Sequence, residues 1–131
     1  MTAIRLRSVS KTFDGDGREG GAYTALAGLA LDIREGEFFC LLGPTGCGKS
    51  TVLHLIAGFD RPTGGTIEVA GRPVAGPGAD RGVVFQTELA LFPWLTVEQN
   101  VAFGLRMRGA PDGERRDIIE RNLELVGLSK H

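Results

Sequence analysis

The chain has 131 residues, which is long enough for one domain with a hydrophobic core and too short for two. Its apolar fraction of 42% and charged fraction of 24% are those of an ordinary globular chain, so disordered and fibrous classes are excluded. The net charge of −1 gives no basic surplus, and we therefore expect no nucleic-acid partner.

The first part of the chain carries strand patterns. Ile4, Leu6 and Val9 are separated by polar residues and predict a strand that ends near Phe13. Residues 29–33 alternate in the same way and predict a half-buried strand. Residues 38–42 form a continuous apolar run, which is typical of a strand covered on both faces. We accordingly expect Cys40, inside that run, to be a small buried hydrophobe rather than a metal ligand.

Helix and turn signals follow the apolar run. A helix is predicted from about residue 49 to 57 with Gly58 as its C-cap, then a hairpin that turns at Gly71. Residues 83–85 predict a short buried strand. Thr96 opens a capping box, and a last helix is predicted over residues 112–126, closed by Gly127.

No segment approaches the ~20 apolar residues that a membrane span needs, and the first residues lack the layout of a signal peptide. The sequence therefore predicts a cytoplasmic protein.

One stretch carries most of the functional information, because it satisfies the pattern G-x-x-x-x-G-K-[ST] in full. Its residues are Gly43, Pro44, Thr45, Gly46, Cys47, Gly48, Lys49, Ser50 and Thr51. The glycines allow successive backbone N–H groups to point at one anion, and the helix that follows adds its N-terminal partial charge. An apolar run directly before and an apolar helix directly after make this a phosphate-binding P-loop.

The P-loop pattern assigns chemistry to individual side chains. Lys49 is placed to reach the β- and γ-phosphates of a nucleotide, the Ser50 hydroxyl to coordinate Mg²⁺, and Thr51 to help with the α-phosphate. A dinucleotide site would need G-x-G-x-x-G, which the Gly46–Gly48 spacing does not continue. Cys40, Cys47 and His54 do not form a zinc site, because no CxxC pair is present.

Several further segments, taken in order, resemble the ATP-binding subunits of ABC transporters. They comprise Ser10-Lys11-Thr12-Phe13, Gly36-Glu37, residues 58–65, Val83-Val84-Phe85-Gln86, residues 76–82 and residues 91–101. The resemblance spans essentially the whole chain, and the last two segments most resemble importers for nitrate, sulfonates or taurine.

The resemblance implies an α/β fold: the core of a P-loop NTPase of the ABC ATPase type, incomplete, with an antiparallel β part and the start of a helical subdomain. Residues 1–90 would form the N-terminal part of the nucleotide-binding core, with the P-loop and the Q-loop. Residues 91–131 would begin the helical subdomain and stop before the signature motif.

The resemblance also implies roles. Phe13 would face the adenine of ATP, with Tyr23 as a weaker rival, and Gln86 would sense the γ-phosphate through Mg²⁺ and the attacking water. Lys49 and Gln86 are thus the catalytic candidates, and Ser50 and Gln86 the metal ligands. The partners would be a membrane permease, facing the apolar residues 91–95, and a second ATP-binding subunit in a homodimer. The protein would lie at the inner face of the cell membrane.

The later motifs of the family have no counterpart here. No L-S-G-G-Q-like signature occurs, and no apolar run ending in Asp-Glu follows Gln86. We therefore expect a truncated ATPase subunit that is inactive alone, in which residues 38–42 lose their neighbouring strand and are exposed along an edge. The alternatives are a non-hydrolysing nucleotide-binding module and a soluble ABC ATPase without a permease.

Overall fold

The computed structural model describes residues 2–15, 21–85 and 91–129, which form two compact units. The first unit, Met1–Arg81, holds a sheet and one helix, and the second, Gly82–His131, holds two helices. Each unit is described by itself below. The sequence-based domain boundary at residue 90 stays a prediction.

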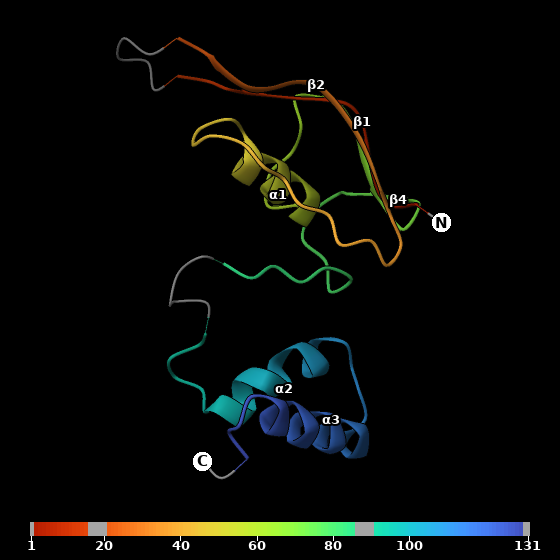
Figure 1. Cartoon of the computed structure of the whole chain (residues 1–131), viewed down its shortest axis with the longest axis vertical. Helices are drawn as coiled ribbons and strands as arrows, with labels where there is room; N and C mark the ends of the chain where they lie inside the picture. Colours follow the sequence, from red (N-terminus) through yellow and green to blue (C-terminus); the bar gives the residue numbers. More distant parts are fainter. Residues whose placement is uncertain (1, 16–20, 86–90, 130–131) are drawn as a thin grey trace. The chain divides into compact units, whose positions relative to one another are not determined.

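The first unit is built on a four-stranded antiparallel sheet in the order β2-β1-β3-β4 (Figure 1). Its strands are β1 (Thr2–Phe13), β2 (Tyr23–Arg34), β3 (Gly64–Val69) and β4 (Arg72–Pro73). The predicted first strand, the strand over residues 29–33 and the hairpin at Gly71 are thereby confirmed, and β2 begins earlier than the alternation indicated. The predicted antiparallel β part is present.

Helix α1 (Lys49–Ala57) lies against one face of this sheet and begins and ends where the sequence predicted (Figure 1). Val52 and Leu55 point inward, and Leu55 is 0% exposed. They join a core cluster with four sheet residues, Leu6, Val9, Leu26 and Ile67. Full burial of one such side chain contributes on the order of 1.5–3 kcal/mol, so this cluster is what holds α1 on the sheet.

Gly58 ends α1 in a left-handed conformation, with φ of 80°. A Cβ atom at this position would lie 2.2 Å from the carbonyl oxygen of Gly76. Glycine is therefore required here for two reasons, its backbone angle and the close approach of another segment.

The predicted buried strand over residues 38–42 is wrong. The segment has no regular secondary structure, and Phe38 and Leu42 are 94% and 92% exposed. Cys40 is exposed as well, contrary to expectation. A strand covered on both faces needs neighbours that accept its backbone hydrogen bonds, and no described segment pairs with it. The exposure agrees with the expectation that these residues lack a neighbouring strand, whereas the predicted strand geometry and the predicted burial of Cys40 are wrong.

The prediction for residues 83–85 is wrong in the same way. They were predicted as a short buried strand, yet no regular structure is assigned to them and Val84 is 95% exposed. Within the described residues no strand pairs with residues 83–85, so they have no sheet to join.

The second unit contains α2 (Val97–Met107) and α3 (Asp112–Leu125). The capping box at Thr96 is confirmed, because its side chain accepts from the Gln99 backbone N–H and the Gln99 side chain accepts from that of Thr96. α3 ends one residue before the predicted limit, with Gly127 at a φ of 73° just after it. None of the helices described is long and apolar enough to cross a membrane.

Candidate functional site

The P-loop is held against the sheet at the point where α1 begins. Gly48 is the N-cap of α1 in a left-handed conformation, with φ of 94° and no side-chain hydrogen bond capping the helix. A Cβ atom on Gly48 would lie 2.9 Å from both the Ala25 carbonyl oxygen and the Leu26 side chain. The helix terminus is thus pressed against β2, and only glycine fits there.

The first turn of α1 has the properties of an anion site. Its leading N–H groups have no intrahelical partners, the helix dipole places partial positive charge there, and no acidic residue lies in the turn. Ser50 and Thr51 occupy this turn, and Ser50 is exposed. Among the described residues neither hydroxyl is engaged in a hydrogen bond, so both are available to a phosphate or its metal ion.

The Lys49 side chain folds back onto the P-loop and binds its backbone. Its Nζ donates to the carbonyl oxygens of Gly43, at 2.8 Å, and of Pro44, at 2.6 Å, and lies 3.5 Å from the Sγ of Cys47. These carbonyls hold the ammonium at the mouth of the loop. Carbonyl oxygens are neutral acceptors, and an anionic phosphate oxygen binds an ammonium more strongly. Lys49 can therefore exchange these partners for a phosphate without leaving the loop.

Two aromatic residues lie beside the P-loop. Phe13 at the end of β1 is directly opposite Tyr23 at the start of β2, so their side chains share a face of the hairpin. The Tyr23 hydroxyl donates to the Gly46 carbonyl oxygen at 3.3 Å. The rings are 41% and 58% exposed, respectively. The structure thus brings both sequence candidates for the base contact to one edge, with Tyr23 attached to the loop itself.

Lys11 is the residue near this edge that sequence reasoning missed as a participant. It is buried, and its Nζ donates to Oδ1 of Asp60 at 2.6 Å and to the Arg61 carbonyl oxygen at 3.0 Å. The hydrogen bond from Lys11 is the main cause that lowers the pKa of the Asp60 carboxyl below its ordinary value. A signal was present in the sequence, since Lys11 lies two residues from both Val9 and Phe13 and so on the inward face of β1.

Gln86, the second catalytic candidate and proposed metal ligand, lies outside the described residues. Its role stays a prediction.

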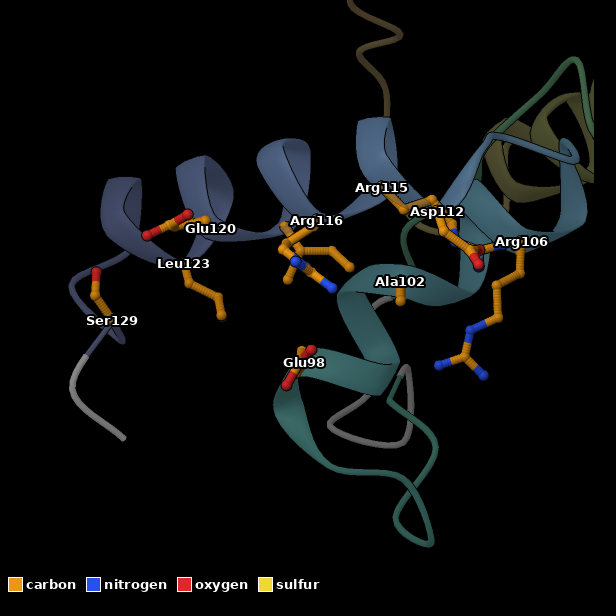
Figure 2. Close-up of a pocket in the computed structure, with 10 residues that line it drawn as sticks. Glu98, Ala102, Arg106, Asp112, Arg115, Arg116, Glu120, Leu123 and Ser129 are labelled. Carbon is orange, nitrogen blue, oxygen red and sulfur yellow. The ribbon is translucent and has the colours of Figure 1, made fainter.

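The second unit has a groove of about 550 Å³ between α2 and α3 (Figure 2). Side chains of both helices line it, including Glu98, Arg106, Arg116 and Glu120, and Arg115 pairs with Asp112 at its edge. Acidic and basic groups balance one another there, and no P-loop residue contributes. The groove is therefore not the phosphate site.

Before α2 the chain carries an exposed apolar segment, residues 91–96. Leu91 is 64% and Trp94 is 74% exposed, whereas Phe92 packs inward on Phe103 with ring centroids 4.5 Å apart. Asn100 fixes the segment, because its side chain donates to the Phe92 and Leu95 carbonyl oxygens and accepts from the Phe92 N–H. Apolar groups are thus held outward on an ordered turn.

Comparison with known proteins places these features in context. The chain matches the family described as "ABC transporter" over residues 26–131. It is 48% identical over 125 residues to the nitrate import ATP-binding protein NrtD of Synechocystis sp., covering 95% of this chain and 46% of that protein. It is 52% identical over 130 residues to the taurine import ATP-binding protein TauB of Chromobacterium violaceum, covering 99% and 48%. The chain therefore spans somewhat less than half the length of these relatives.

The fold has counterparts among solved structures. One is the dimeric structure of a post-hydrolysis state of the ATP-binding cassette MJ0796 bound to ADP and Pi, with a TM-score of 0.72 and 36% sequence identity. The match covers 92% of this chain and 54% of that one. The fold class predicted from the sequence is thereby confirmed.

We predict that nucleotide affinity depends on Lys49, because its ammonium is the one side-chain cation within the P-loop. Lys49→Ala should weaken ATP binding by roughly 1.5–3 kcal/mol, which is more than tenfold. Isothermal titration calorimetry measures this, with Arg72→Ala on exposed β4 as the matched loss of a cation away from the loop. Equal ATP affinity in wild type and Lys49→Ala would rule out the site.

Proposed function

This chain belongs to the ABC transporter family, and on that premise we propose that it is the ATP-binding part of an importer's ATPase subunit. The intact subunit would couple ATP binding and hydrolysis to the uptake of a solute such as nitrate, a sulfonate or taurine. The observation that carries the proposal is the P-loop at the N-terminus of α1, with its lysine and two aromatic rings at one edge. The names of the relatives support the importer class.

We infer that different groups of the P-loop bind the phosphates and the metal ion of Mg-ATP. The backbone N–H groups between Gly43 and Thr51 would hold the phosphate oxygens, and Lys49 would turn from its two carbonyl partners to the β- and γ-phosphates. The Ser50 hydroxyl would be a ligand of Mg²⁺, with Gln86 as a second candidate ligand. The exposed Ser50 and the uncapped helix terminus fit these groups. When bound, Mg²⁺ would neutralise charge that develops on the phosphates.

The base would lie at the aromatic edge. We assign the stacking contact to Phe13 and a supporting contact to Tyr23, because the Tyr23 hydroxyl already holds the P-loop. Stacking requires an accessible ring face, and Phe13 retains 41% of its exposure.

Two protein partners are part of the proposal. The exposed apolar segment before α2 would contact a membrane permease, and a second ATP-binding subunit would complete the hydrolytic site. Large apolar side chains held outward on an ordered turn, such as Leu91 and Trp94, support the first. The dimeric cassette similar to this chain supports the second. Such a protein would work at the cytoplasmic face of the membrane.

We predict that Phe13→Ala weakens ATP and ADP alike, because stacking on the base does not depend on the γ-phosphate. The expected loss is ~1–3 kcal/mol. Parallel calorimetric titrations with both nucleotides measure it, and Trp94→Ala, which removes an exposed ring outside the first unit, is the control. Unchanged affinity in Phe13→Ala together with a loss in Tyr23→Ala would transfer the stacking role to Tyr23.

The 131 residues by themselves should bind Mg-ATP and hydrolyse it hardly at all. Hydrolysis needs a carboxylate that positions water and donors for the transition state, and no apolar run ending in Asp-Glu follows Gln86 in this sequence. Missing electrostatic groups each cost ~10²–10³ in rate.

A phosphate-release assay on the pure chain tests this. Turnover of ~1 per second or more, abolished by Lys49→Ala, would contradict the prediction and place a catalytic carboxylate among these residues. ATP binding without turnover is also what the non-hydrolysing alternative predicts, because the two readings agree on the activity of the 131 residues alone.

Attachment to a permease tests the remaining alternative, an ABC ATPase without a permease. We expect the tagged chain to co-purify with a polytopic membrane protein from detergent-solubilised membranes, and Trp94→Ala to reduce the yield of the complex. Replacing Trp94 removes a large exposed apolar surface at the proposed contact. Met107→Ala, also exposed and apolar but at the end of α2, serves as the control. Recovery in the soluble fraction alone would favour an ABC ATPase without a permease.

A further inference from the structure

Lys11 is the one charged residue that is buried in the described part of the chain, with 9% of its surface exposed. A buried ammonium is unfavourable unless hydrogen bonds and an opposite charge compensate for its lost hydration. The position of such a group is therefore well determined by its partners. Those partners come from two places that matter to nucleotide binding.

The first partner is the connection between α1 and β3. Nζ of Lys11 donates to Asp60 Oδ1 at 2.6 Å and to the carbonyl oxygen of Arg61 at 3.0 Å. Asp60 is only partly exposed, and its Oδ1 also accepts from the backbone N–H of Arg61 at 2.7 Å. The same connection is attached to β1 a second time, since Thr63 N–H donates to the Ser10 carbonyl oxygen at 2.8 Å.

The second partner is the ring of Phe13. Lys11 and Phe13 are two residues apart on β1 and thus on the same face, and Nζ lies over the ring, 4.8 Å from its centroid. An ammonium at this distance is attracted to the electron-rich face of an aromatic ring. With one face against the cation, the ring has the opposite face left for a planar ligand.

We propose that Lys11 is a positioning residue for the purine base. The Lys11 ammonium, held by Asp60 and by the Arg61 carbonyl oxygen, lies against one face of the Phe13 ring and so fixes the orientation of that ring. The inference rests on the proposed adenine contact of Phe13 and deepens it. Lys11 itself does not touch the nucleotide. It links the ring to the end of α1, whose other end is the P-loop, so base and phosphates are held by parts of one connected element.

The test compares Lys11→Met, which keeps the apolar stem but removes the charge, with wild type on three ligands: ATP, ADP and inorganic tripolyphosphate. We expect Lys11→Met to weaken ATP and ADP by the same factor, about 3- to 10-fold, as for the loss of one cation–π contact. Binding of tripolyphosphate, which has no base, should change less than about twofold. Lys11→Arg should restore most of the affinity, because a guanidinium also pairs with carboxylates and stacks on rings.

Arg5→Met is the matched control. Arg5 also lies on β1, where it pairs with Asp32 at 2.8 Å, but near the opposite end of the strand from Phe13. It should leave all three affinities unchanged. Equal weakening of tripolyphosphate and ATP by Lys11→Met would show that Lys11 only supports the fold, and no weakening would show that the ring needs no support. Either result overturns the proposal.

If circular dichroism shows that Lys11→Met is unfolded, Asp60→Asn decides by the same three titrations, because it loosens the ammonium without removing it. A loss confined to ATP and ADP supports the proposal, and a uniform or absent loss overturns it. Phe13→Ala separates the two levels. If it leaves ATP affinity unchanged, the proposed base contact itself fails; if it weakens ATP while Lys11→Met does not, only the role of Lys11 fails.

Discussion

The site depends on the packing of α1 against the sheet. Val52 and Leu55 are buried among residues of β1, β2 and β3, and this contact fixes a helix of only nine residues that would not be stable by itself in water. Once α1 is fixed, the direction of its dipole and of its first N–H groups is fixed as well. Close approach of Gly48 to β2 then sets where an anion meets the protein. The phosphate site is thus a consequence of core packing and of one residue without a side chain.

The two ends of α1 are tied to the same hairpin by different kinds of interaction. At the beginning, the contacts are the packing of Gly48 on β2 and the hydrogen bond from Tyr23 to Gly46. At the end, the ion pair of Asp60 with Lys11 attaches the following connection to β1. Because Phe13 and Tyr23 oppose one another across β1 and β2, both attachments converge on the aromatic edge. Displacing α1 would therefore alter the phosphate and base contacts together.

The sequence predicted those parts of the structure whose causes are local. The limits of α1, the capping box at Thr96 and the turn at Gly71 each follow from residues within a few positions of one another. Residues 38–42 and 83–85 were mistaken for buried strands. An apolar run indicates that the segment would be more stable when covered, but it does not identify the segment that covers it. The ion pair of Lys11 was not predictable for a similar reason, since its partner lies 49 positions away and is brought near only by the fold.

The P-loop is flanked by α1 on one side and by residues 38–42 on the other, and these two flanks differ in how firmly they are packed against the core. The helix flank rests on the core through Val52 and Leu55. On the other flank, Leu41 is the residue of the preceding segment that packs against the core, while Phe38 and Leu42 are almost fully exposed. Lys49 bridges the two flanks by donating to the carbonyl oxygens of Gly43 and Pro44. A phosphate that draws Lys49 away removes this bridge and must replace it with its own contacts to the loop N–H groups. Part of the binding free energy is then used to fix residues 38–42. Any interaction that covers these residues should therefore strengthen nucleotide binding without touching the nucleotide.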